Sequence, residues 1–436
     1  MTFLWSCEKD SATNSQQDEE LNQLLSSVSN DNGAEFFILP DSDDFANIPQ
    51  DPNNPITKEK VELGKLLFHE TGLAINPENE ISTGNFSCAS CHFASAGFQA
   101  GRFQGIGEGG IGFGINGEGR IKGSLYPGSM IDVQPIRSPS ALNMAYQSAI
   151  LWNGQFGATG PNSGTEYAWT EDTPKAVNSL GYEGTEIQAI AGLKVHRMGA
   201  DTAFMADKNY LEYFRKAFPN LTFPEECNNE TMGLAIAAYE RTLLPNRAPF
   251  QQWLKGDRNA MSELQKEGAI IFFGKGECNT CHTGPAMSTM EFHAYGMKDL
   301  YQINELTFKT NSENTENMGR GGFTGNEEDM FKFKVPQLYN LKDSPFYGHG
   351  SSFRSIREVI EYKNRGTKEN DNVPDEALSE HFKPLDLSES EITALTDFIM
   401  NGLYDSYLNR YEPSSVLSGN CFPFNDPMAK SHLGCD

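Results

Sequence analysis

The chain has 436 residues, with 34 Lys and Arg against 59 Asp and Glu, so its formal net charge is −25. This balance argues against nucleic acid as a partner, because nucleic-acid binding rests on neutralising phosphates with Lys and Arg. No apolar run reaches the roughly 18 residues of a membrane-spanning helix, and the length favours two or three domains. Eight cysteines are too few for a disulfide-built fold, so their spacing carries the information.

The chain begins like the end of a bacterial lipoprotein signal. A short apolar stretch leads into Ser-Cys7, and in this interpretation Cys7 carries a lipid that anchors the protein. The stretch is shorter than a secretory apolar region and lacks a basic start, so an ordinary Cys in a frayed terminus is the alternative. Residues 8–45 are rich in Ser, Asn, Asp, Gln and Glu, a composition that cannot bury a core. We therefore expect residues 1–45 to be a signal remnant and a polar tether.

Helical signals then follow in chain order. Thr57 is a candidate N-cap for a first helix, residues 232–243 and 264–273 read as further helices, and a capping box at Ser388 opens a helix whose apolar face runs from residue 392 to residue 403. Two of the helical segments match in sequence: they share Gly, two aliphatic residues and Phe at the same offsets, in Gly64-Lys-Leu-Leu-Phe68 and Gly268-Ala-Ile-Ile-Phe272. The match indicates a duplicated unit, with chance similarity of short helices as the alternative.

Between the first helices lies a Gly-rich segment, residues 101–128. It has no strand before it and lacks the Gly-Lys-Ser/Thr ending of a phosphate-binding loop. We therefore expect a long ordered loop with many positive φ angles, which glycine adopts without steric cost. Strand signals elsewhere are few, and the fold class is mainly α.

Each matched helix leads into the same chemical motif, Cys-x-x-Cys-His, at Cys88-Ala-Ser-Cys91-His92 and at Cys278-Asn-Thr-Cys281-His282. The motif is the attachment signature of c-type haem: each thiol adds to one vinyl group, and the His supplies the proximal nitrogen to the iron. A zinc site would need two Cys pairs close together, and a thioredoxin-like pair would need a βαβ context. Two copies behind matching helices favour two covalent haems.

The motifs divide the chain into two cytochrome c-like haem domains with long loops, related by duplication. We predict an N-terminal haem domain over residues 46–225. The C-terminal haem domain covers residues 226–436 and includes a C-terminal extension. The occupant of the sixth position of each iron then decides the function, because an open iron binds peroxide whereas a closed one passes electrons.

The order of motifs over about residues 55–405 resembles the bacterial di-haem cytochrome c peroxidase superfamily. That superfamily includes the di-haem enzyme that matures the tryptophan-derived cofactor of methylamine dehydrogenase. The matching stretches are Leu63-Gly-Lys-Leu-Leu-Phe, Phe86 to His92 with Ala96-Gly-Phe98, Arg137 to Asn143 with Trp152-Asn-Gly, Ala237 to Leu243, Phe273 to Pro285, Lys334 to Asn340 and Glu358 to Gly366.

The resemblance implies a peroxidatic N-terminal haem and a C-terminal haem that receives electrons. It also implies a Trp between the two haems, matched by Trp152, and a calcium ion between the domains. The activity would be reduction of hydrogen peroxide to water, with electrons from a small cytochrome or copper protein. The alternatives are a di-haem oxidase that uses peroxide to modify Tyr or Trp of a partner protein, and a non-enzymatic electron carrier.

The peroxide site departs from the family pattern. The family's Gln is matched by Gln188, but the position of its Glu is filled by Arg197, with His196 beside it. An imidazole is a suitable group for moving the proton that accompanies O–O cleavage, so we take His196 as the candidate acid–base residue. The alternative is a His bonded to a carbonyl or a propionate. No His lies between His92 and His196, so the His cap of many family members is missing and the iron is expected to be open.

The sequence at the second haem also departs from the family pattern, at the position of the distal ligand. Classical peroxidases supply a distal Met there and the cofactor-maturing enzyme supplies Tyr, whereas the match places Lys363 at this position, with Tyr362 one residue before. Neighbouring helix residues point about 100° apart, so only one of the two reaches the iron, and we favour Lys363. Met318 or Met330 is the alternative ligand. His349 matches the family's His between the domains.

Covalent haem attachment usually takes place outside the cytoplasm, so we expect a periplasmic protein or an outer-membrane-anchored lipoprotein of a Gram-negative bacterium. That compartment permits disulfides. Cys421 and Cys435 would close a short C-terminal loop, although Cys227 could pair instead, so the connectivity stays open. The acidic surface would dock a basic redox partner.

Overall fold

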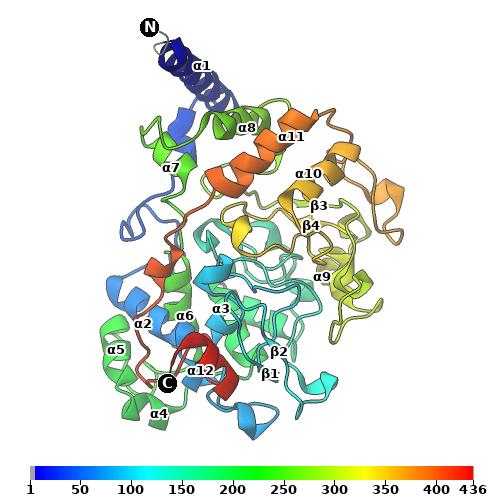
Figure 1. Ribbon diagram of the computed structural model, residues 1–436. Coiled ribbons are helices and arrows are strands. Elements are labelled where there is room, and N and C mark those ends of the chain that lie inside the picture. Colours follow the sequence, from blue (N-terminus) through cyan, green and yellow to red (C-terminus); the bar gives the residue numbers. More distant parts are fainter. Residues whose placement is uncertain (1–4, 436) are drawn as a thin grey trace.

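The computed structural model describes residues 5–435, and side chains from residue 16 onward. The chain is mainly helical, as predicted (Figure 1). Its α-helices are α1 (Trp5–Val28), α2 (Lys58–His69), α3 (Gly184–Val195), α4 (Thr202–Asp207), α5 (Tyr210–Ala217), α6 (Asn229–Glu240), α7 (Pro249–Leu254), α8 (Glu263–Phe273), α9 (Gly321–Thr324), α10 (Ile356–Arg365), α11 (Glu389–Asp397) and α12 (Pro427–Leu433). The described strands form two short antiparallel pairs, β1 (Gly110–Ile111) with β2 (Ile121–Lys122) and β3 (Phe292–His293) with β4 (Phe333–Lys334).

Two large clusters of buried apolar side chains form the core. The first joins α2, α3, α5 and α6, in the lower half of Figure 1, and the second joins α1, α7, α8, α10 and α11, in the upper half. The chain passes from the first cluster to the second between Leu243 and Leu244. Each end of the chain packs on the cluster formed mainly by the other half of the sequence: α1 packs on the second cluster, and the segment from Leu408 onward packs on the first.

This division of the core differs from the predicted domain boundary at residue 226. Helix α6 lies beyond that boundary, yet it packs between α2 and α3 in the first cluster. The physical reason is that α6 is buried along nearly its whole length, so it needs helices on more than one side. The C-terminal extension likewise covers the first cluster rather than the second.

The predicted polar tether is wrong for the segment that forms α1. Leu21 and Leu25 are completely buried against the second cluster. Asp18 accepts a hydrogen bond from Trp253 Nε1 at 2.7 Å and pairs with Lys266 Nζ at 2.6 Å. The average composition of residues 8–45 concealed two leucines four positions apart, which share one helix face.

The membrane anchor stays a prediction. Cys7 lies in α1, but its side chain is outside the described ones. Among the described helices, none combines the length and apolar character needed to cross a bilayer.

Local sequence signals fix the helix ends and crossings. Thr57 caps α2 by accepting a hydrogen bond from Lys60 N at 3.2 Å, and the capping box at Ser388 opens α11, both as predicted. The two matched glycines lie at tight helix crossings. A Cβ on Gly64 would meet Ala235 O at 1.9 Å, and one on Gly268 would meet Ala394 O at 2.1 Å. The shared Gly therefore serves the same purpose in α2, which crosses α6, and in α8, which crosses α11.

The C-terminal extension fastens the Gly-rich loop to the first core cluster. A disulfide joins Cys421 to Cys435, whereas Cys227 is buried and unpaired. Asp426, which lies between Cys421 and Cys435 in the sequence, forms a buried ion pair with Arg120 of the loop at 3.1 Å. His432 Nδ1 also accepts hydrogen bonds from the backbone of the loop, at Phe113 N and Gly114 N, each at 3.0 Å.

Removing the disulfide is expected to destabilise this extension. For Cys421→Ser we expect a loss of about 3 kcal/mol in the free energy of unfolding, because the bond closes a loop of about 15 residues in the unfolded chain. Urea unfolding with and without a thiol reductant measures the effect. The reductant should destabilise the unaltered protein and leave Cys421→Ser unchanged, and equal sensitivity of the two would contradict the prediction.

Candidate functional site

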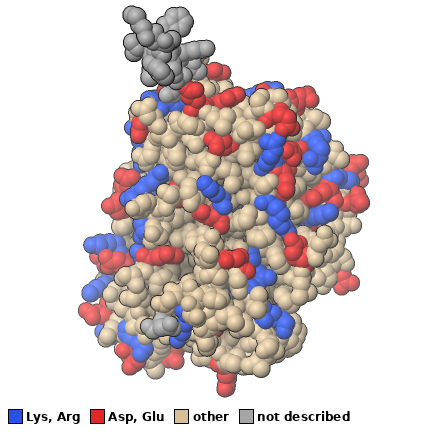
Figure 2. All heavy atoms as spheres, viewed as in Figure 1, with Lys and Arg blue, Asp and Glu red and all other residues tan. Residues whose placement is uncertain are grey.

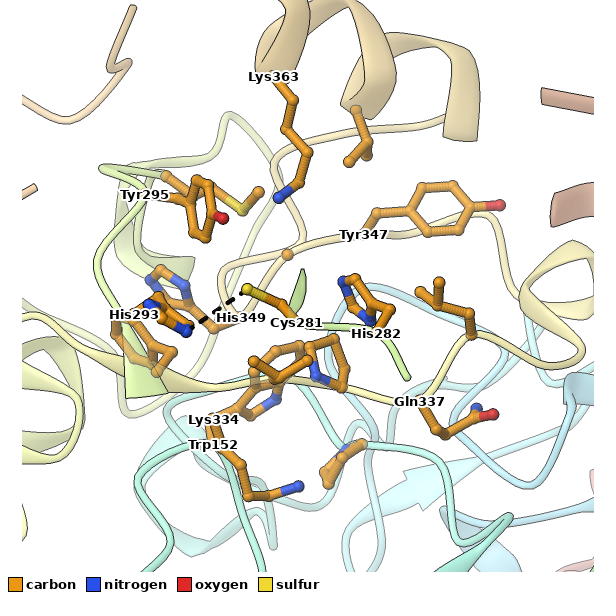
Figure 3. A pocket seen from close by; sticks show the side chains of 18 of the residues that line it. Trp152, Cys281, His282, His293, Tyr295, Lys334, Gln337, Tyr347, His349 and Lys363 are labelled. Atoms are coloured by element: carbon orange, nitrogen blue, oxygen red, sulfur yellow. Dashed lines mark hydrogen bonds between the residues drawn. The ribbon is translucent and has the colours of Figure 1, made fainter. Parts of the chain in front are cut away.

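The second Cys-x-x-Cys-His motif opens onto a cavity of about 260 Å³ (Figure 3). The motif follows α8 directly, and a tight turn places Cys278, Cys281 and His282 at the cavity wall. The remaining wall is largely apolar and comes from α8, α10, α11 and the segment after β4. Trp152, His349 and Lys363 also line this cavity, so four parts of the chain that are distant in sequence meet at one motif.

The two motif histidines have the same environment. His282 Nδ1 donates to Met287 O and His92 Nδ1 donates to Phe98 O, each at 3.2 Å. Burial lowers the pKa of His282 to about 3 and that of His92 to about 4. Both imidazoles are therefore neutral, with Nε2 left as the free lone pair, which is the arrangement a metal-ligating His requires.

Of the two candidate distal residues of the second site, only Lys363 lines the cavity. Lys363 projects from α10 into the cavity, where its Nζ lies 3.6 Å from the centre of the Tyr295 ring (Figure 3). Burial lowers the pKa of Lys363, which favours the neutral amine that a metal ligand must be. Tyr362 turns away and donates its hydroxyl hydrogen to Tyr295 O at 2.6 Å. Neither Met318 nor Met330 lines the described cavity.

Two buried cations border this cavity. Arg137 donates to Gln99 Oε1 and Ser344 Oγ, and Lys334 donates to Gln147 Oε1. Among the described residues, no carboxylate is within ion-pair distance of either cation. Burial lowers the pKa of Arg137 to about 9 and that of Lys334 to about 8.

These features fit a haem. The cavity offers two thiols, a neutral imidazole, an apolar wall and two buried cations that lack an anionic partner. A haem carries an apolar macrocycle and two carboxylates, and buried charges are ordinarily paired. The residues that would hold the group are Cys278, Cys281 and His282, with Arg137 and Lys334 toward its carboxylates.

Trp152 and His349 form an aromatic connection beside the second motif. Trp152 Nε1 donates to Arg137 O at 2.8 Å, and its ring centre lies 6.3 Å from that of His349. His349 stacks on Phe333 at 3.6 Å and bonds to Asp299 through Nε2 at 3.0 Å. The backbone of Arg137 also donates to His349 O, so the segment that follows the first motif is tied directly to the second site.

The first motif lies at a smaller cavity, of about 50 Å³. The structure brings together Cys88, Cys91, His92, Gln188 and His196 at its wall, as the sequence predicts. Two further walls, from the Gly-rich loop and from α6, narrow this space. The two thiols and the imidazole of this cavity fit the donor set of a haem.

His196 and Arg197 have different surroundings. His196 lines the cavity, and its Nδ1 lies 2.8 Å from Asp132 Oδ2. Burial by itself lowers the pKa of His196, but the Asp132 carboxylate outweighs it and the net pKa is raised. Arg197 does not line the cavity, because its guanidinium turns to Glu108, at 2.8 Å, and to Asp132, at 3.6 Å.

Three buried carboxylates near the first motif escaped the sequence analysis. Glu108 lies within the Gly-rich loop and Asp132 follows it by four residues, both far from His196 in sequence, and only their acidic character marks them. Glu240 ends α6 within a matched family stretch and lines the first cavity. One of its oxygens, Oε2, has no hydrogen-bond partner among the described atoms. Burial raises the pKa of Glu240 to about 8, and the nearby Glu186 contributes.

Glu240→Gln is expected to stabilise the protein at neutral pH. A carboxyl whose folded-state pKa lies above its unfolded value costs stability as pH rises from about 4.5 to about 8 and costs nothing below that range. We expect a gain on the order of 2 kcal/mol at pH 7.5 and none at pH 4. Urea unfolding at both pH values measures it.

Glu186 is the matched control for this substitution. Its carboxylate is equally buried but pairs with Arg241 at 2.6 Å. Glu186→Gln should therefore destabilise the protein at pH 7.5, because the buried Arg241 loses one of its two carboxylate partners, Glu183 being the other. An equal gain for Glu240→Gln at both pH values would contradict the assignment of its effect to charge.

Comparisons with known proteins agree with the site. Residues 58–259 match the family model of di-haem cytochrome c peroxidases. The chain is 29% identical over 371 residues to cytochrome-c peroxidase IdrP1 of Pseudomonas sp. (strain SCT), covering 81% of this chain and 83% of the relative. It is 26% identical over 355 residues to the methylamine utilization protein MauG of Methylorubrum extorquens, covering 81% and 80%.

A similar fold occurs among solved structures. The chain superposes on a MauG-like protein associated with microbial copper homeostasis with a TM-score of 0.57 and 22% sequence identity, covering 85% of this chain and 95% of that one. The likeness supports the fold alone. Two haem-attachment motifs, a matching family model and relatives along most of the chain agree on one assignment. Over residues 58–259 the chain matches the di-haem cytochrome c peroxidase family model, and along most of its length it is similar to cytochrome c peroxidases and to MauG.

Proposed function

We propose that the protein is an exported di-haem peroxidase that reduces hydrogen peroxide to water with electrons from a small cytochrome or copper protein. The difference between its two sites carries this proposal. The first cavity is lined by Gln188, whose amide can hydrogen-bond a small reactant, and by His196, whose imidazole can move a proton, together with His92. The second places the Lys363 amine where it faces the His282 motif. One site is therefore suited to a small reactant and the other to electron transfer.

The residues of the two Cys-x-x-Cys-His motifs, together with Lys363, would bind the haems. Cys88 with Cys91, and Cys278 with Cys281, would hold the two haems through thioethers. When bound, these haems supply the redox-active iron. His92 and His282 offer Nε2 as proximal ligands, and Lys363 offers a neutral amine on the opposite side of the second site.

Gln188 and His196 would act on peroxide, and Trp152 would connect the two sites. Gln188 orients peroxide through its amide, and His196 moves the proton. Trp152, whose ring lies beside that of His349, connects the second cavity to the segment that follows the first motif. Arg197 is a catalytic candidate by sequence because it fills the position of the family's Glu, but it pairs with Glu108 and Asp132 and does not line the first cavity.

Peroxide-dependent modification of a Tyr or Trp of a partner protein is the second candidate function. The absence of Met318 and Met330 from the described second cavity, and the amine that lines it instead, favour this candidate over a classical peroxidase. MauG is among the relatives, at the same level of identity as several peroxidases. A di-haem electron carrier without catalysis is the third.

Steady-state turnover separates these functions. A peroxidase consumes hydrogen peroxide continuously when a reduced small cytochrome is supplied. A partner-modifying oxidase would show negligible turnover together with a long-lived change in the haem spectrum after peroxide alone. An electron carrier would have two six-coordinate irons, so a high-spin component in the ferric spectrum would exclude it.

The location and the other partners belong to the same proposal. We place the protein in the periplasm, or on the outer membrane of a Gram-negative bacterium through a lipid at Cys7. Acidic and basic side chains are interspersed on the face shown in Figure 2, although the net charge is −25. A basic donor would bind through this excess of charge, and its binding should weaken with added salt. A calcium ion between the haem domains and a duplication origin for those domains remain part of the proposal, the second supported by the equivalent crossings at Gly64 and Gly268.

A further inference from the structure

The Gly-rich loop ends in a carboxylate that points at the first cavity. Backbone hydrogen bonds hold this end of the loop closed, from Gly107 N to Asp132 O at 2.9 Å and from Asp132 N to Glu108 O at 3.0 Å. A Cβ on Gly107 would lie 3.0 Å from Asp132 Oδ2, so glycine leaves the space that the carboxylate occupies. Asp132 is 6% exposed and lines the cavity with His196.

The Asp132 carboxylate fixes the orientation of the His196 ring. Its Oδ2 lies 2.8 Å from Nδ1, and a carboxylate accepts, so Nδ1 carries the hydrogen. With Nδ1 engaged, Nε2 is the ring nitrogen left for a molecule in the cavity. A carboxylate on one ring nitrogen is the usual device for fixing which tautomer an active imidazole adopts.

The charges around this pair keep the carboxylate ionised. Burial alone raises the pKa of Asp132, but His196, Arg197 and Lys309 together lower it below its usual value. Arg197 Nη2 lies 3.6 Å from Asp132 Oδ2, while Arg197 Nε is held by Glu108 at 2.8 Å. Glu108 is itself fixed by Asn79 N and the Tyr126 hydroxyl. The ion pair of Arg197 and Glu108 therefore anchors the turn, whereas Asp132 alone reaches the imidazole.

We propose that Asp132 is a positioning residue, which holds His196 so that Nε2 exchanges a proton with peroxide in the first cavity. This inference rests on the proposed function. Nε2 takes a proton from one peroxide oxygen and gives it to the other, which leaves as water when the O–O bond breaks. The charge of His196 is unchanged over the step, and the remaining peroxide oxygen becomes a second water with two electrons from the reduced redox protein and two protons from solvent. The acid–base pair thus comes from a loop and a helix end, in place of the Glu that the family pattern expects.

Cyanide binding to the ferric protein, with both haems attached, tests the pair without peroxide chemistry. Hydrogen cyanide loses its proton on binding, and a group in the cavity must take that proton and then hydrogen-bond the bound anion. We expect Asp132→Asn and His196→Gln each to raise the cyanide Kd of the first haem by about 10-fold. The double variant should be no weaker than His196→Gln alone, because Asp132 acts through His196.

Glu118→Gln is the control, since it alters a carboxylate of the Gly-rich loop that accepts hydrogen bonds from Ile115 N and Asn116 N and does not line the first cavity. Its cyanide Kd should stay within about twofold of the unaltered protein. A normal Kd for Asp132→Asn, or additive effects in the double variant, would overturn the inference. So would a low-spin first haem that becomes high-spin in His196→Gln, since His196 would then be an iron ligand. If the cyanide Kd values change as expected but the protein does not turn over peroxide, the proposed peroxidase function is wrong, whereas the role of Asp132 in positioning His196 is supported.

Discussion

Replacing Cys88 and Cys91 together by serine is expected to leave one covalently bound haem and to abolish reaction with peroxide. Both thiols lie at the first cavity with His92, and a serine hydroxyl does not form the thioether that retains the haem. The haem that these thiols would hold is the one beside Gln188 and His196, which line the same cavity. The intact mass should fall by one haem, and peroxide consumption should fall by at least about 1000-fold, as expected when the reacting centre itself is lost.

The matched double substitution is Cys278→Ser with Cys281→Ser. It should also leave one haem, but at the other site, so the first haem should still respond to peroxide and bind cyanide while electron delivery from the donor is lost. The two double variants therefore have the same mass, but only the variant that retains the first haem should react with peroxide. Equal loss of the peroxide response in both would contradict the assignment of separate roles to the two sites.

Lys363→Met is expected to raise the reduction potential of the second haem and to leave the first unchanged. A neutral amine stabilises ferric iron relative to a thioether, so Met in its place favours the reduced state. The rise falls within the roughly 0.8 V that axial ligands cover among haem proteins. Spectroelectrochemical titration measures both potentials, and the low-spin signal of the ferric second haem should change at the same time.

Tyr362→Phe is the control, one residue away on the same helix. Tyr362 points out of the cavity to Tyr295 O, so its removal costs a hydrogen bond and should not alter either potential. A potential that moves in Tyr362→Phe and not in Lys363→Met would reverse the assignment of the distal ligand. No change in either variant would point to a ligand outside α10.

The sequence was sufficient wherever the chemistry lies within a short stretch. Cys88 to His92 and Cys278 to His282 are local motifs, and each lines a cavity with its His Nδ1 bonded to a backbone carbonyl. Helix caps such as Thr57 are equally local. Helix geometry also allowed a choice between Lys363 and Tyr362, because neighbours on a helix face different directions, and only Lys363 lines the cavity.

What the sequence could not provide depends on contacts between distant segments. Asp132 and His196 are 64 positions apart, and nothing in either stretch indicates that the loop closes on the helix end. The role of α1 was missed for a related reason: Leu21 and Leu25 are few among polar residues, yet both face α8. The disulfide between Cys421 and Cys435 was one of several pairings that spacing alone allowed.

Steady-state consumption of hydrogen peroxide by the as-isolated protein, with a reduced small c-type cytochrome as donor, tests the central claim most directly. A first haem without a His cap, as proposed, predicts turnover that starts without prior reduction of the protein, saturates with peroxide, and disappears in the Cys88→Ser, Cys91→Ser variant. Peroxide consumption no faster than that of this variant, in protein whose mass shows both haems attached, would contradict the claim.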